Sequence, residues 1–136
     1  MEDAKNREYY ELVQKAKELV ALHSSADQVI IVKTQKGNVY HFINYLHVDG
    51  QFIGKSDDEE RFVQMLLDKE EPVLKYIVCM WNEYSIDVPS MHFRELLMSI
   101  SEKNADAMLV LKSVSDLNLK KLSVCMPSPM EEKDNS

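Results

Sequence analysis

Residues that break or cross-link a chain are scarce in this sequence: its 136 residues include three glycines, four prolines and two cysteines. We find no low-complexity segment and no internal repeat. Cys79 and Cys125 each lie inside a short apolar run, which favours buried, unreactive thiols over a disulfide or a metal site. Apolar runs of membrane-spanning length are lacking, as is an N-terminal signal-peptide pattern, so we expect a cytoplasmic protein that does not enter a membrane.

Positive charge is also in short supply. The chain has 16 lysines and arginines against 23 aspartates and glutamates, which gives a net charge of −7. Such a surface repels nucleic-acid phosphates and anionic membranes, so we expect neither as a partner. The hydrophobic content of 45% suffices for one core. We predict a single domain over residues 1–126 and a disordered tail over residues 127–136, where prolines and mixed charges gather.

The hydrophobic pattern predicts alternating helices and strands. Apolar residues at helical spacing indicate helices over residues 7–23, 56–69 and 89–103. β-Branched or continuously apolar runs indicate strands over residues 29–32, 39–43, 73–81, 107–111 and 122–126. Gly37-Asn38 favours a hairpin between the first two strands, whereas 44–55 is expected to be a loop and 115–121 a helical or turn segment. This order predicts an α/β fold with a mixed five-stranded sheet and helices on both faces.

Two of the predicted helices begin with capping residues. Ser56 and Glu59 have the spacing of a capping box, and Pro89-Ser90 suits the start of the later helix. Because both helices follow strands, we expect their N-termini to meet at one edge of the sheet. Two N-termini at one edge make an electropositive corner, which is a common place for a ligand or a metal.

Short motifs follow one another along the chain in this order: Lys36-Gly37-Asn38-Val39-Tyr40 before Asn44, Glu60-Arg61, Ile77-Val78, Asn82-Glu83, and Pro89 with Arg94-Glu95-Leu96-Leu97. In their order and spacing they resemble the small cytidine deaminases and, in part, their blasticidin-S-deaminase branch, over residues 7–126. Asn44-Tyr45-Leu46-His47 is similar to a segment of the blasticidin-type enzymes. The resemblance implies a cytidine-deaminase-like three-layer α-β-α sandwich that assembles as a homo-oligomer, either a dimer or a tetramer.

Members of that family bind zinc through Cys-Ala-Glu or His-Ala-Glu at one helix start and Pro-Cys-x-x-Cys at the other, and the glutamate moves protons. By resemblance, these motifs fall on Asp58-Glu59-Glu60 and on Pro89-Ser90-Met91-His92-Phe93. Glu60 keeps the general acid/base position, while Asp58, Ser90 and Phe93 stand at the metal-ligand positions. Serine is a poor zinc ligand and phenylalanine cannot be one, so we expect no metal and no other cofactor.

Loss of zinc would remove most of the activation of water that hydrolytic deamination needs. Bound zinc lowers the pKa of water from about 15.7 to about 7, which is worth on the order of 10 kcal/mol in making hydroxide. Glu60 alone does not replace that, so the leading prediction is a zinc-less protein without deaminase activity. Its remaining pocket would bind a nucleoside or related small molecule through Asn44, Asp58, Ser90 and Arg94, or be filled by side chains. Arg94 is expected to pair with Asp58 or Glu60.

Two alternatives stay open. The first is a deaminase of cytidine or blasticidin S with a rearranged metal site made from Asp58, His92 and Cys79. Against it, His92 lies about 100° around the helix from Phe93, so its ring should leave the pocket side. The second alternative is a structural or partner-binding subunit. Apart from these alternatives, Glu60 can be a plain helix N-terminal charge, favourable with the helix dipole, instead of an inherited acid/base residue.

Overall fold

The computed structural model describes residues 2–114 and 116–126, with side chains described from residue 8 onward. The elements lie in the order α1 (Glu2–Leu22), β1 (Gln28–Thr34), β2 (Val39–Asn44), β3 (His47–Val48), β4 (Gln51–Phe52), α2 (Asp57–Asp68), β5 (Leu74–Trp81), β6 (Ile86–Asp87), α3 (Met91–Ile100), β7 (Met108–Lys112) and β8 (Leu117–Lys121). Short 3-10 helices follow α3 and β8, at Glu102–Asp106 and Leu122–Cys125. The predicted tail over 127–136 lies outside the described residues.

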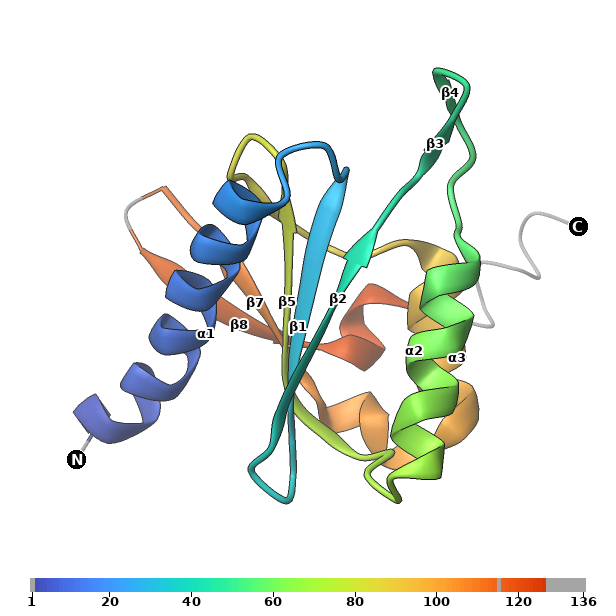
Figure 1. Ribbon diagram of the computed structural model, residues 1–136. Helices are drawn as coiled ribbons and strands as arrows, with labels where there is room; N and C mark the ends of the chain where they lie inside the picture. Colours follow the sequence, from blue (N-terminus) through green and yellow to red (C-terminus); the bar gives the residue numbers. More distant parts are fainter. Residues whose placement is uncertain (1, 115, 127–136) are drawn as a thin grey trace, which may run out of the picture.

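The main sheet has the strand order β2-β1-β5-β7-β8, and the short β6 adds to β5. β5 and β7 are parallel, whereas β1 is antiparallel to both β2 and β5, and β8 is antiparallel to β7. The sheet is therefore mixed. Figure 1 shows α1 on one face of the sheet and α2 with α3 on the other, which confirms the predicted three-layer α-β-α architecture.

Side chains along the central strands point alternately to the two faces of the sheet, so the core has two parts. In β5, Ile77 and Cys79 join the core under α2 and α3, whereas Val78 and Met80 join the core under α1. All four side chains are almost completely buried. A strand covered on both faces reads as a continuous apolar run, which is why residues 73–81 were predictable as a central strand.

The fifth main strand differs from the prediction. It is β8, in a segment expected to be helical or a turn, and residues 122–126 contain a 3-10 helix in place of the expected strand. Leu117 and Leu119 alternate with polar residues and pack toward the core under α1, while Leu122 is buried in the core on the opposite face. The chain therefore has to cross the edge of the sheet after β8, and the 3-10 turn makes that crossing.

Residues 44–55 were expected to form a loop, but they contain a small second sheet. β3 and β4 pair only with each other, and Figure 1 shows this hairpin projecting beyond the main sheet. Its base is closed by a hydrogen bond from the Ile53 amide to the Leu46 carbonyl, 2.7 Å long. Asp27 anchors it to the sheet, because one carboxylate oxygen accepts from the His47 amide at 3.0 Å and the other lies 2.9 Å from His47 Nδ1.

The C-terminal end of α2 is held by a buried carboxylate. Glu71 is 6% exposed and accepts hydrogen bonds from the Thr34 hydroxyl at 2.6 Å, from the Asn38 amide at 2.9 Å and from the Tyr40 hydroxyl. These neutral donors, Thr34 first, lower the pKa of Glu71 to about 2. The segment after α2 is thereby tied to the β1–β2 hairpin in a way that depends on an ionised Glu71.

Acid is expected to weaken this tie. The folded-state pKa of Glu71 lies below its ordinary value of 4.5, so its contribution to stability is complete above that value and is lost as the pH falls toward about 2. Glu71→Gln should lower the urea midpoint at pH 7 and flatten its fall between pH 4.5 and pH 2. Glu70→Gln, a change at the exposed neighbour, is the control and should behave as the wild-type chain does. Parallel acid curves for Glu71→Gln and wild type would refute this assignment.

No helix within the described ranges has the length and apolar character needed to cross a bilayer.

Candidate functional site

The two predicted helix starts do meet, and a buried carboxylate lies between them. Glu59, in the first turn of α2, is 0% exposed. Its Oε1 accepts from the Ser56 backbone amide at 3.1 Å, and its Oε2 accepts from Asn44 Nδ2 at 3.1 Å and from Ser90 Oγ at 2.8 Å. All three donors are neutral, and they come from the end of β2, the cap of α2 and the cap of α3.

The donors around Glu59 are themselves held in place. Asn44, also 0% exposed, directs Nδ2 to Gln28 Oε1 at 3.1 Å as well as to Glu59, and its Oδ1 accepts from the Ser56 hydroxyl. Ser90 Oγ accepts from the Phe93 backbone amide at 3.1 Å while it donates to Glu59. We call Gln28, Asn44, Ser56, Glu59 and Ser90 the Glu59 cluster. It links two strands to two helix starts.

Local sequence explains why Glu59 turns inward. Ser56 caps α2 by accepting from the Glu59 amide at 3.3 Å, and the Glu59 carboxylate returns to the Ser56 amide, which completes the capping box that the sequence predicts. That reciprocal pair directs Glu59 toward the sheet. Its spacing from Ser56 marked the cap but did not reveal a buried site, because most capping boxes lie at the surface.

Of the predicted pocket residues, Asn44 and Ser90 come together, but Glu59 is the carboxylate between them. Glu60, one position further around the helix, has a side chain that is 56% exposed, and its Oε1 lies 3.2 Å from His92 Nε2. The structure therefore places Glu60 outside the Glu59 cluster. Its role as the general acid/base remains a prediction from the resemblance.

The expected ion pair between Arg94 and Asp58 or Glu60 is wrong. Arg94 Nε donates to the Pro89 carbonyl at 2.9 Å, and its guanidinium also donates to the Cys125 carbonyl. Asp58 instead pairs with Arg61 at 2.6 Å. Arg94 therefore fastens the 3-10 turn after β8 to the start of α3.

The residues at the expected metal-ligand positions do not fit a zinc ion. Phe93 is 0% exposed and packs against Phe42 and Phe62, with ring centroids 5.5 and 6.2 Å away. Ser90 is engaged by Glu59 and by the Phe93 amide, and a serine hydroxyl is a poor ligand in any case. Within residues 8–114 and 116–126, no three His, Cys, Asp or Glu side chains are grouped so as to hold a metal ion.

The rearranged ligand set of Asp58, His92 and Cys79 is not assembled either. Asp58 faces Arg61 and His92 faces Glu60, as described above. Cys79 is 1% exposed within β5, and its burial, helped by the nearby Asp87 and Glu59 carboxylates, raises the pKa of the thiol. A thiol that resists ionisation is a poor metal ligand.

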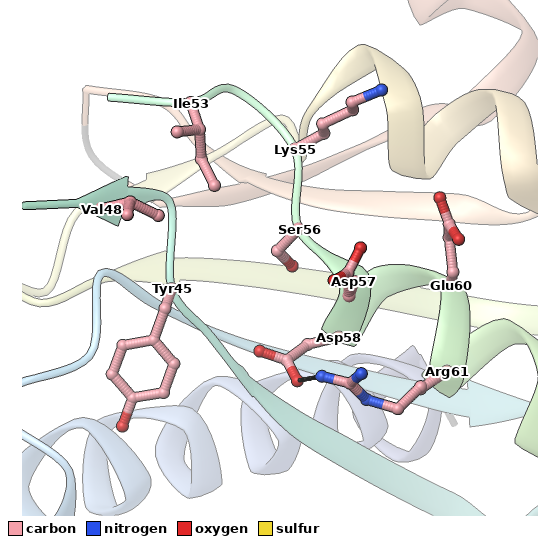
Figure 2. A pocket seen from close by; sticks show the side chains of 9 residues that line it. All are labelled: Tyr45, Val48, Ile53, Lys55, Ser56, Asp57, Asp58, Glu60 and Arg61. Atoms are coloured by element: carbon pink, nitrogen blue, oxygen red, sulfur yellow. Dashed lines mark hydrogen bonds and ion pairs between the residues drawn. The ribbon is translucent and has the colours of Figure 1, made fainter. Parts of the chain in front are cut away.

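An open hollow of about 400 Å³ lies beside the Glu59 cluster, between the β3–β4 hairpin and the start of α2. In Figure 2, Val48 and Ile53 of the hairpin segment lie on one side and the acidic first turn of α2 on the other. The lining residues are Tyr45, Val48, Ile53, Lys55, Ser56, Asp57, Asp58, Glu60 and Arg61. Two predicted site residues, Asp58 and Glu60, therefore face this outer hollow, and Ser56 belongs to both the hollow and the cluster.

Comparison with known proteins supports the fold alone. Cytidine deaminase from Burkholderia pseudomallei aligns with a TM-score of 0.62 and 15% identity over 88% of this chain and 96% of its own. For cytidine deaminase from Mycobacterium leprae the TM-score is 0.58, with 12% identity over 83% of this chain and 94% of that one. The chain has a cytidine deaminase-like fold.

A Glu-to-Gln variant of cytidine deaminase from Mycobacterium tuberculosis shares the fold as well, with a TM-score of 0.53 and 16% identity over 74% of this chain and 76% of its own. No family model matches the sequence, and no curated protein does. The cytidine deaminase-like fold is thus carried here by a sequence far from those of these enzymes. In this chain the Glu59 cluster lies between the starts of α2 and α3.

Proposed function

We propose that this protein has the cytidine deaminase-like fold without its zinc chemistry and that it acts by binding. The observation that carries the proposal is the use of the metal-ligand positions for other purposes. Ser90 belongs to a closed hydrogen-bonded cluster, and Phe93 belongs to an apolar core. Neither side chain can turn toward a metal without giving up these contacts.

The proposed absence of zinc is tested on purified protein. Elemental analysis should find well under one zinc per chain, and cytidine or blasticidin S should release no ammonia above the rate without protein. The expected loss follows from the missing help in forming hydroxide, on the order of 10 kcal/mol. Stoichiometric zinc, or turnover that a chelator abolishes, would establish the alternative of an active deaminase with a rearranged metal site.

We further propose that the hollow binds a nucleoside or a related small molecule. Tyr45, Val48 and Ile53 offer an aromatic and apolar surface, while the carboxylates of Asp57 and Glu60 can accept hydrogen bonds from hydroxyl or amino groups. Three carboxylates line the hollow against the two cations of Lys55 and Arg61. A phosphate group would be repelled by this excess, so nucleosides are favoured over nucleotides.

Thermal shift measurements test this pocket. Nucleosides should raise the melting temperature and their monophosphates should raise it less, since a ligand at a hundred times its dissociation constant adds about 2.7 kcal/mol. Tyr45→Ala should abolish the ligand-induced shift. Tyr84→Ala removes a comparably exposed tyrosine from the turn between β5 and β6 and should preserve the shift. Absence of any shift with nucleosides, nucleotides and bases would favour a structural or partner-binding subunit instead.

We also propose that the protein is a homo-oligomer, a dimer or a tetramer, in the cytoplasm. Support for assembly comes from the projecting hairpin, where Val48 is 54% exposed and Phe52 is 61% exposed. Exposed large apolar side chains on a projecting element are available for contact with a second copy of the chain.

Light scattering coupled to gel filtration tests the assembly. The wild-type chain should elute with the mass of a dimer or tetramer. Replacing both exposed hairpin residues, Val48→Ser with Phe52→Ser, should shift it toward the monomer because the contact loses its apolar area. Leu22→Ser changes an exposed leucine at the end of α1 and should leave the mass unchanged. A wild-type monomer would rule out the oligomer.

A further inference from the structure

Buried neutral donors converge on one point between the starts of α2 and α3. Asn44 Nδ2, the Ser56 amide and Ser90 Oγ all lie within 3.1 Å of a Glu59 carboxylate oxygen. We propose that these donors form a small-carboxylate site whose resident ligand is the chain's own Glu59 side chain. The carboxylate then joins the two helix starts at the place where the family resemblance expects a metal. This inference rests on the proposed absence of zinc.

The electrostatics of the site suit an anion. Unpaired backbone amides give a helix N-terminus partial positive charge, and here the starts of two helices adjoin the same carboxylate. Asn44 contributes both Nδ2 hydrogens, one to Glu59 and one to Gln28. The groups that point into this space are hydrogen-bond donors. Their hydrogens repel a metal ion, whereas they pair with both oxygens of a carboxylate.

The donors do not depend on Glu59 alone for their positions. Gln28 and the Ser56 hydroxyl fix the Asn44 amide, and the Phe93 amide fixes the Ser90 hydroxyl. Removing the Glu59 side chain should therefore leave a preformed site rather than a collapsed one. Glu59→Ala deletes a methylene and a carboxylate, which together have nearly the size and shape of acetate.

The occupied site also limits where other ligands bind. Because Glu59 and Asn44 are completely buried, a nucleoside can reach the outer hollow but cannot reach the space between the helix starts. Ser56 caps α2 from inside the cluster and lines the hollow on its outer side, so the carboxylate fixes one wall of the hollow. In this chain, Glu59 is a positioning residue for whatever the hollow binds.

Chemical rescue of the full-length chain tests the site. Glu59→Ala should melt several degrees below wild type in chloride and should recover at least half of that loss when acetate replaces chloride at constant ionic strength and pH 7. Glu18→Ala, at an exposed position within α1, should change neither the melting temperature nor its response to acetate. An equal response of Glu59→Ala to acetate and to chloride would overturn the inference.

The test remains decisive if Glu59→Ala does not fold in chloride. If Glu59→Ala is unfolded in chloride, recovery of its circular dichroism signal in acetate supports the site. If it is unfolded in both salts, Glu59→Gln decides. A thermal midpoint well below that of Glu18→Gln supports a required carboxylate, and equal midpoints overturn it. Zinc is measured in the same samples. Zinc in the wild type would refute the proposed function, whereas failed rescue without zinc would refute this inference alone.

Discussion

The buried Glu59 carboxylate determines how the end of β2 meets the starts of α2 and α3. Asn44 at the end of β2, the cap of α2 and the cap of α3 all donate to it, so moving any one of these segments would take away one of its three buried donors. An unpaired buried carboxylate costs several kcal/mol, more than a typical surface contact contributes. The geometry at this edge of the sheet is therefore fixed by a hydrogen-bonding requirement rather than by apolar packing alone.

A buried carboxylate anchors each end of α2. Glu59 ties the start of the helix to the sheet end where Gln28 pairs with Asn44, and Glu71, just after the helix, ties the opposite end to the Thr34 turn. In both places the donors are neutral hydroxyl and amide groups. Apolar residues of α2 such as Phe62 and Leu66 fill the space between the two anchors. The helix is thus held by polar contacts at its ends and by packing along its length.

Sequence patterns predicted the parts of this fold that a strong local pattern specifies. The continuous apolar run of β5 and the Gly37 turn between β1 and β2 needed no further information, since each pattern permits few structures. Leu117 and Leu119 carry an alternation too short to separate a strand from a turn. Whether the chain forms β8 there depends on the free edge of β7, which no local pattern reveals.

The candidate site was predictable only in outline. The helix starts and the meeting of Asn44 and Ser90 at the corner followed from capping and from the resemblance. Four consecutive acids from Asp57 onward offered no way to tell which one turns inward, because a shift of one position rotates a helical side chain by about 100°. The capping geometry of Ser56 settles the choice in favour of Glu59.

This one-position difference changes what the corner can do. The Glu60 carboxylate is exposed, contacts His92 and lines the outer hollow. A carboxylate at Glu59 has both oxygens engaged by buried donors, and using it as a base would break the links between the helix starts. Catalysis by Glu59 and the stability of the corner are therefore in direct competition. In this chain the contacts favour stability, which leaves the outer hollow as the part of the site that is open to a ligand.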